Sequence, residues 1–242
     1  MTTFLLIHGG CHRSWCFDPL LPYLEERGFR ADAIDLPYDD PQISLAELGQ
    51  AAEAAVSAVD DDIIVVGHSM GGHVAPLAVN APNVFGLVML CAVVPEPGIS
   101  GLKLNADPEN APYVVPPDAV ELDPAARMSF RSAEVLGELL YNDCDDATVS
   151  WAWERLNALA TPINVDSCPL REWPDVPTVS IICTDDRIVA PAWSRRAAAR
   201  IGAITILLPG SHSPFASRPR ELAEALEAAA DFIANRQSAR TD

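Results

Sequence analysis

The chain alternates short apolar runs with stretches whose apolar residues recur at helical spacing. Four consecutive β-branched residues at 63–66 are typical of a strand buried on both faces, as in a parallel sheet. Apolar runs predict strands at residues 3–7, 30–34, 63–66, 84–94, 178–183 and 204–208. Helices are predicted at residues 17–27, 44–59, 72–80, 191–200 and 218–235. This alternation predicts an α/β fold, with a mostly parallel sheet of about six strands and helices on both faces.

The alternation is interrupted between residues 96 and 176, where prolines are frequent. Helical spacing recurs near residues 132–141 and 147–159, and no strand is evident. A stretch of about 80 residues is too long for a plain loop. We therefore expect residues 1–95 and 177–242 to form the α/β core, with residues 96–176 inserted as a mostly helical cap.

The strand predicted at residues 63–66 leads into the sequence G-H-S-M-G at residues 67–71, which fits G-x-S-x-G. A strand, a tight turn and a helix in this order are typical of a nucleophile elbow, in which a strained turn presents a serine hydroxyl at the carboxyl end of the sheet. The flanking glycines leave room for the chain to approach itself, and the following helix points its first amides at developing negative charge. Ser69 is therefore the candidate nucleophile.

A serine hydroxyl needs a base to take its proton, and the base needs a third group to orient it. His212 follows the last predicted strand, so it is expected at the same edge of the sheet as Ser69. Asp186 follows the strand before that one and is the preferred acid. Asp185 beside it, and Glu96 after an earlier strand, remain alternatives.

An oxyanion hole needs two backbone N–H groups aimed at one point. Met70, directly after the candidate nucleophile, is expected to supply one. Gly10, in the loop after the first strand, is expected to supply the other, with Cys11 as the alternative. Cys11 and aromatic residues of the inserted segment are candidates for an apolar substrate pocket, although each aromatic residue could instead form the segment's own core. These pocket candidates are Cys11, Tyr113, Phe130, Tyr141, Trp151 and Trp153.

Charge and motif content narrow the possible partners. The net charge of −18 argues against binding to nucleic acid or to an anionic membrane surface. The sequence has no metal-ligand spacing, dinucleotide fingerprint or phosphate loop, so neither a metal nor a cofactor is expected. The expected partner is a small-molecule substrate, and a homodimer is compatible with the sequence.

Cysteine usage and hydropathy bear on the compartment. The six cysteines form no C-x-x-C pair and no regular spacing, which favours free thiols in a reducing compartment. The N-terminus lacks a signal-peptide pattern, and no run of 18 apolar residues occurs. We therefore expect a cytoplasmic protein without a membrane span.

Residues 4–17 resemble the opening "HGxCHGAWCW" segment of the α/β-hydrolase branch that holds plant methylesterases and hydroxynitrile lyases, with bacterial esterases beside them. Residues 67–72 and 186–191 match this branch too. The resemblance covers nearly the whole chain and implies an α/β-hydrolase fold, in which the nucleophile, acid and histidine occur in that order. It also implies the roles already considered for five residues: Ser69, His212, Asp186, Gly10 and Met70.

Two departures from the lyases of this branch affect the expected activity. Those lyases carry a threonine directly after the opening histidine, where this chain has Gly9. They also carry a lysine after the catalytic histidine to meet the cyanide leaving group, where this chain has Ser213. The sequence therefore favours a serine hydrolase that cleaves a small apolar or aromatic carboxylic ester through an acyl-enzyme. A lactone or C–C bond hydrolase, a lyase or cyclase without an acyl-enzyme, and a non-enzymatic ligand receptor remain alternatives.

Overall fold

The structure, a computed structural model, describes residues 2–106, 111–113 and 115–241. In this part of the chain, six parallel strands form the main sheet in the order β2-β1-β3-β4-β8-β9. These strands are β1 (Thr2–Ile7), β2 (Arg30–Ile34), β3 (Asp62–His68), β4 (Val84–Leu90), β8 (Thr178–Cys183) and β9 (Ile204–Leu208). The predicted mostly parallel sheet of about six strands is confirmed.

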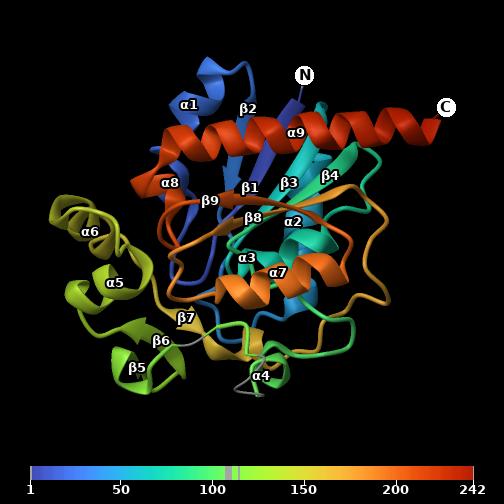
Figure 1. Ribbon diagram of the computed structural model, residues 1–242. Helices are drawn as coiled ribbons and strands as arrows, with labels where there is room; N and C mark the ends of the chain where they lie inside the picture. Colours follow the sequence, from blue (N-terminus) through green and yellow to red (C-terminus); the bar gives the residue numbers. More distant parts are fainter. Residues whose placement is uncertain (1, 107–110, 114, 242) are drawn as a thin grey trace.

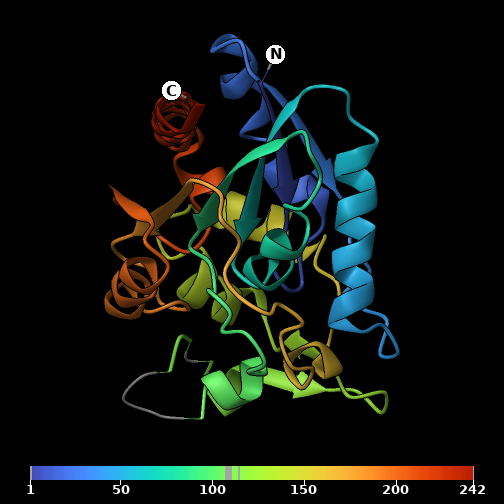
Figure 2. The same ribbon diagram turned by 90° about the vertical axis from the view of Figure 1, so that its right-hand side faces the viewer.

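Helices cover both faces of this sheet (Figures 1 and 2). The helix α9 packs against β4, β8 and β9 on one side, and α2 lies beside α3 on the other (Figure 2). The core helices are α1 (Leu21–Glu26), α2 (Leu45–Ser57), α3 (Gly71–Val74), α7 (Pro191–Arg200), α8 (Pro214–Ser217) and α9 (Pro219–Thr241), with 3₁₀ turns η1 (Ser14–Phe17) and η2 (Ala75–Leu77). Because both faces are covered, the apolar side chains of the central strands β1 and β3 are buried throughout.

Two elements end earlier in the structure than their apolar patterns in the sequence predict. The strand predicted at 84–94 ends at Leu90, because Cys91 adopts a left-handed conformation with φ of 45°. The helix predicted at 72–80 changes to the 3₁₀ turn η2 at Ala75, because Pro76 has no N–H with which to continue the α-helical hydrogen bonds. Both changes occur where the chain must turn beside the carboxyl edge of the sheet.

The segment of residues 96–176 leaves the core after β4 and returns before β8, and its helices and short strands lie below and to the left of the main sheet in Figure 1. Its helices are α4 (Gly101–Leu104), α5 (Ala133–Leu140) and α6 (Asp146–Trp153), with 3₁₀ turns η3 (Pro117–Ala119) and η4 (Thr161–Asn164). It also contains a small antiparallel sheet of β5 (Val120–Leu122), β6 (Arg127–Phe130) and β7 (Leu159–Ala160). The expectation that this segment holds no strand is therefore wrong; strands of two to four residues are too short to show an alternating pattern.

Candidate active site

The end of β3 and the start of α3 form a tight turn around Ser69. Ser69 has a φ of 52°, a left-handed conformation that a non-glycine residue adopts only when its surroundings enforce it. Close packing holds the turn, since a Cβ on Gly71 would lie 2.6 Å from the carbonyl oxygen of Ile7. The Ser69 N–H donates to the Leu90 carbonyl at 3.1 Å, which ties the turn to β4. The sequence thus places Ser69 at the carboxyl edge of the sheet on a constrained backbone.

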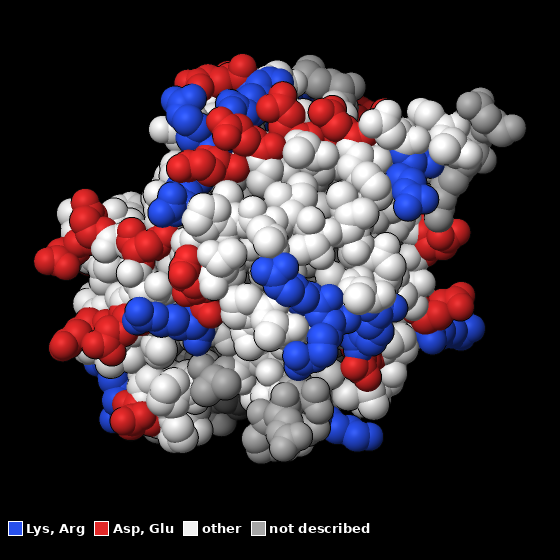
Figure 3. All heavy atoms as spheres, viewed as in Figure 1, with Lys and Arg blue, Asp and Glu red and all other residues white. Residues whose placement is uncertain are grey.

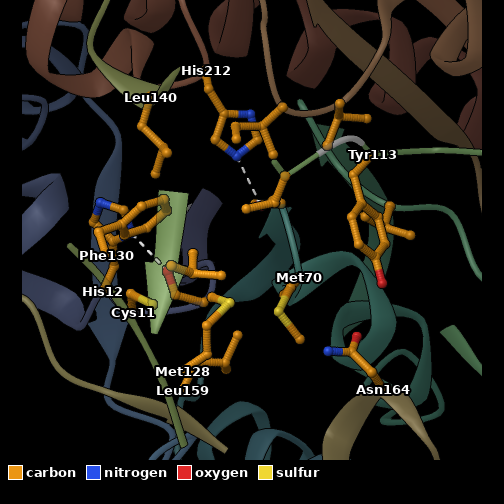
Figure 4. Close-up of a pocket in the computed structure, with 17 residues that line it drawn as sticks. Cys11, His12, Met70, Tyr113, Met128, Phe130, Leu140, Leu159, Asn164 and His212 are labelled. Atoms are coloured by element: carbon orange, nitrogen blue, oxygen red, sulfur yellow. Dashed lines mark hydrogen bonds between the residues drawn. The ribbon is translucent and has the colours of Figure 1, made fainter. Parts of the chain in front are cut away.

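His212 lies between Ser69 and Asp186 in a continuous line of hydrogen bonds. Its Nε2 is 2.8 Å from Ser69 Oγ, the contact drawn in Figure 4, and its Nδ1 is 2.8 Å from Asp186 Oδ2. An ionised carboxylate can only accept, so Nδ1 carries the ring proton of the neutral imidazole. Nε2 is then left to accept the hydrogen of the Ser69 hydroxyl, which is the geometry that general-base activation of a serine requires.

Asp186 is oriented by the turn that follows β8. Its Oδ1 accepts from the N–H groups of Ile188 and Val189 at 2.8 and 2.9 Å, while Oδ2 faces His212. The carboxyl side chain is 2% exposed. Two backbone donors therefore fix the rotamer that presents the second oxygen to the imidazole.

The other two acids considered from the sequence lie away from this line. Asp185 accepts from the Gly210 N–H at 3.1 Å and from the Thr184 hydroxyl at 2.9 Å. Glu96 forms an ion pair with Arg200. Within the described residues, neither carboxylate has a hydrogen bond to His212, which leaves Asp186 as the acid in contact with it.

The loop after β1 lies beside the turn at Ser69. Within the described residues, neither the Gly10 nor the Met70 amide N–H donates to another protein group, so both are available to a ligand. A Cβ on Gly10 would come within 2.8 Å of Met70 Sδ, which shows how closely the two segments approach. Cys11, next along the loop, has a φ of 63° and is held in a left-handed conformation. Two unpaired donors in adjoining segments next to Ser69 are what an oxyanion hole requires.

The inserted segment contacts this loop through two hydrogen bonds. The His12 Nδ1 lies 3.0 Å from the Gly10 carbonyl oxygen and must donate to it, so Nε2 accepts from the Tyr141 hydroxyl at 2.7 Å. The Asn157 N–H donates to the Cys11 carbonyl at 2.9 Å. Burial lowers the pKa of His12 to about 3, which keeps the ring neutral. Sequence reasoning did not single out Asn157, because a backbone donor leaves no signal in the residue type.

A cavity of about 250 Å³ opens beside Ser69 (Figure 4). Its wall combines residues of the turn and of the β1 loop with residues of the inserted segment. No aspartate, glutamate, lysine or arginine is among the described residues that line it. The Cys11 thiol in this wall is also uncharged, because burial raises its pKa to about 12. The cavity therefore suits an uncharged, largely apolar ligand.

A sequence model of the alpha/beta hydrolase family matches residues 4–225. The chain belongs to the alpha/beta hydrolase family. A pyrethroid hydrolase from Sphingobium wenxiniae is 29% identical over 259 residues, which cover 99% of this chain and 91% of that protein. Methylesterase 7 from Arabidopsis thaliana is 25% identical over 256 residues, 96% of this chain and 97% of that one. A crystal structure of a pyrethroid hydrolase from Sphingobium faniae has a TM-score of 0.76 at 25% identity, covering 96% of this chain and 97% of its own.

These relatives confirm the resemblance to the hydrolase branch that holds plant methylesterases. Within this alpha/beta hydrolase, three of the six predicted pocket residues line the cavity: Cys11, Tyr113 and Phe130. The other three lie elsewhere. Tyr141 faces His12, the Trp151 ring packs edge-on against Trp15 at 5.0 Å, and Trp153 is 36% exposed at the surface. The lining residues that the sequence did not single out include Val93, Val115, Val120, Met128, Leu140, Leu159, Asn164, Ile188 and Val189.

Four other histidines of this alpha/beta hydrolase are buried: His8, His12, His68 and His73. Burial lowers the pKa of His8 and of His73 to about 4, and it holds the pKa of His68 well below its ordinary value. All four rings are therefore neutral near pH 7. The His68 Nε2 donates to the His212 carbonyl at 2.9 Å and so supports the loop that carries His212.

The surface of this alpha/beta hydrolase is unevenly charged. In Figure 3, arginines gather over α7, which carries Arg195, Arg196 and Arg200, and acidic side chains gather over α1 and α6.

In the described ranges, no group of three or more His, Cys, Asp or Glu side chains is placed to hold a metal ion. No helix in the same ranges combines the length and the apolar character needed to cross a bilayer.

Proposed function

We propose that this alpha/beta hydrolase is a serine esterase that cleaves a small, uncharged carboxylic ester with an apolar or aromatic part. One observation carries the proposal: the hydrogen-bonded line from Asp186 through His212 to Ser69 ends at an uncharged cavity. The names of the full-length relatives, a pyrethroid hydrolase and a methylesterase, support ester cleavage as the reaction. In this proposal, residues 96–176 act as the cap that closes the cavity over Ser69.

The proposed reaction begins with the proton of the Ser69 hydroxyl. His212 Nε2, 2.8 Å away, takes this proton while Oγ attacks the ester carbonyl carbon. The carbonyl oxygen becomes negatively charged and accepts hydrogen bonds from the Gly10 and Met70 amides. Loss of one such donor lowers kcat by about 10²–10³-fold in serine hydrolases in general. Asp186 holds the Nδ1–H and stabilises the imidazolium that forms.

The second half of the proposed reaction returns the site to its starting state. His212 gives its proton to the departing alkoxide, and the alcohol leaves an acyl group on Ser69. A water molecule then attacks the acyl carbon as His212 takes one of its protons. Collapse of the second tetrahedral intermediate breaks the Ser69 ester bond, releases the acid and returns the proton to Oγ. No cofactor enters this sequence of steps.

The surroundings of Ser69 favour hydrolysis over cyanohydrin cleavage. A Cβ on Gly9 would lie 2.8 Å from the Cβ of Ser69, so a threonine side chain does not fit there without moving the nucleophile. Ser213, after His212, is fully buried and offers a hydroxyl where a lyase would need a cation. Both positions support an acyl-enzyme route rather than release of cyanide.

The proposal is tested by screening p-nitrophenyl esters and lactones with wild type and Ser69→Ala in parallel. We expect ester turnover in wild type, a loss of at least about 10³-fold in kcat/KM in the variant, and fluorophosphonate labelling of wild type at Ser69. Turnover of lactones alone would instead favour the lactonase alternative. Ester turnover that survives the substitution would contradict the proposed nucleophile, and binding without turnover would favour a receptor.

A further inference from the structure

The wall of the cavity is not uniformly apolar. The hydroxyl of Tyr113 and the side-chain amide of Asn164 lie at one end of it, on the opposite side of Met70 from Cys11 and His12 (Figure 4). Neither the hydroxyl nor the amide has a hydrogen-bond partner within the described residues. Most of the remaining wall is aliphatic or aromatic. Apart from the backbone amides of Gly10 and Met70, the unused hydrogen-bonding capacity of the described wall residues is therefore concentrated at one end.

A third unpaired polar atom lies next to Asn164. The His73 side chain is 3% exposed, and its Nε2 has no partner within the described residues. A Cβ placed on Gly101 would come within 3.2 Å of Asn164 Oδ1 and 3.4 Å of His73 Nε2, so both atoms border the same point. Buried polar side chains nearly always have a hydrogen-bond partner. His73 does not line the cavity, whereas Tyr113 and Asn164 do and are only half-buried, so the partner of these two groups can come from a ligand in the cavity.

The charge state of these groups limits what that partner can be. Burial raises the pKa of Tyr113 and lowers that of His73 to about 4, so the phenol and the imidazole are both neutral near pH 7. No cationic or carboxylate side chain lines the cavity within the described residues. An ionised group placed here would lose its hydration and find no counter-ion. An uncharged donor or acceptor would lose far less and would gain hydrogen bonds.

We propose that Tyr113 and Asn164, with His73 beside Asn164, form a polar subsite whose two lining side chains bind an uncharged hydrogen-bonding group of the substrate, such as an ether, hydroxyl or carbonyl oxygen, away from the scissile ester. This inference rests on the proposed esterase function and narrows its substrate class. The ester is then held at two points, with its reactive carbonyl at Ser69 and its second polar group at Asn164. Two-point binding determines which part of the substrate reaches the nucleophile. A site built to pair a polar group also discriminates against the analogue that lacks it.

The test uses matched pairs of esters in which one methylene is replaced by an ether oxygen, as in p-nitrophenyl hexanoate and p-nitrophenyl 4-methoxybutanoate. One series varies the oxygen position in the acyl part, and a second series of acetates varies it in the alcohol part. The measured quantity is the kcat/KM of each ether relative to its alkyl partner. In wild type, we expect this ratio to peak at one oxygen position in one series. In Asn164→Leu and Tyr113→Phe, the ratio at that position should fall by about tenfold.

The matched control is Asn80→Leu, the same substitution at an exposed residue outside the cavity. Its ratios should equal those of wild type, and melting temperatures show that each variant is folded. The inference is overturned if no position gives a peak, or if Asn164→Leu and Asn80→Leu have the same ratios.

Dissociation constants for the same pairs with Ser69→Ala separate this inference from the proposed function. Wild-type turnover with equal binding of ether and alkyl esters would refute the subsite and leave the esterase intact. A preference in binding without any wild-type turnover would support the subsite and refute the esterase.

Discussion

The contact between Tyr141 and His12 gives a sharp prediction, because it joins the inserted segment to the loop of Gly10. Tyr141→Phe removes one hydroxyl that donates to His12 Nε2 at 2.7 Å, and both side chains are almost fully buried. The remaining phenyl ring keeps the packing of the site. The His12 Nε2 then has no donor, while its Nδ1–H still faces the Gly10 carbonyl. The substitution therefore loosens the support of the proposed oxyanion donor without removing the donor.

The expected losses of folding stability and of kcat follow from the two groups affected, the His12 ring and the Gly10 amide. An unpaired buried acceptor costs about 1–3 kcal/mol, which sets the loss of folding stability. Complete loss of an oxyanion donor would lower kcat by about 10²–10³-fold, and misplacement of the Gly10 amide should give only part of that. We expect kcat to fall by about tenfold, which corresponds to roughly 1.4 kcal/mol of transition-state stabilisation. KM should change little, because Tyr141 does not line the cavity.

Tyr38→Phe is the matched control for this prediction. The Tyr38 hydroxyl is also buried, but it has no hydrogen-bond partner within the described residues. Its removal should therefore leave kcat unchanged and should not lower the free energy of unfolding. Both variants are assayed for kcat and KM on p-nitrophenyl acetate and for unfolding in urea. An equal kcat in the two variants, or a change confined to KM, would refute the role given to Tyr141.

Three further predictions concern other parts of the site. Asp186→Asn should lower kcat by about 10⁴-fold on p-nitrophenyl acetate, because the amide disturbs the tautomer of His212, whereas Asp185→Asn should stay within about threefold of wild type. Gly9→Thr should lower kcat/KM at least about tenfold in the same assay, since its Cβ would lie 2.8 Å from that of Ser69. Stability measured by urea unfolding should fall as the pH drops from about 6.5 to about 4, because the buried histidines stay neutral when folded and bind protons when unfolded. His73→Met should reduce this slope by up to about 1.4 kcal/mol per pH unit.

Each of these has a result that would contradict it. Comparable losses of kcat in Asp186→Asn and Asp185→Asn would contradict the assignment of Asp186 as the acid that orients His212. For Gly9→Thr, the control is Gly202→Ala, at an open surface turn with φ of 67°, which should affect stability rather than turnover. Full activity of the threonine variant would show that the backbone at Ser69 shifts to accommodate the added side chain without loss of function. A slope unchanged by His73→Met would mean that this ring already binds its proton in the folded state.

The regular part of the fold could be predicted from the sequence because burial on both faces of a parallel sheet leaves continuous apolar runs. The run at residues 63–66 became β3, and the position of Ser69 after it followed from chain direction alone. The choice of Asp186 over Asp185 depended on the turn after β8, where the N–H groups of Ile188 and Val189 orient one carboxylate and not its neighbour. Sequence spacing favoured Asp186 but does not specify such backbone contacts.

The wall of the cavity could be predicted only in part. The prediction that aromatic residues line the cavity is correct for Tyr113 and Phe130. It is wrong for Trp151, which packs against Trp15, a residue far away in the sequence. An apolar side chain has the same residue type whether it faces a ligand or another tryptophan. Most of the wall consists of Val, Leu, Ile and Met residues, which carry no chemical signal of their own. Asn164 is recognisable only when its neighbours are known.

An ester and the acid released from it differ by one full negative charge. In the proposed reaction, the new carboxylate would find no arginine or lysine among the described side chains around it. It would also leave a molecule whose own net charge is −18. The cavity that binds the uncharged ester therefore disfavours the carboxylate product. Product inhibition should be weak, so turnover should continue at its initial rate while the acid accumulates in the medium.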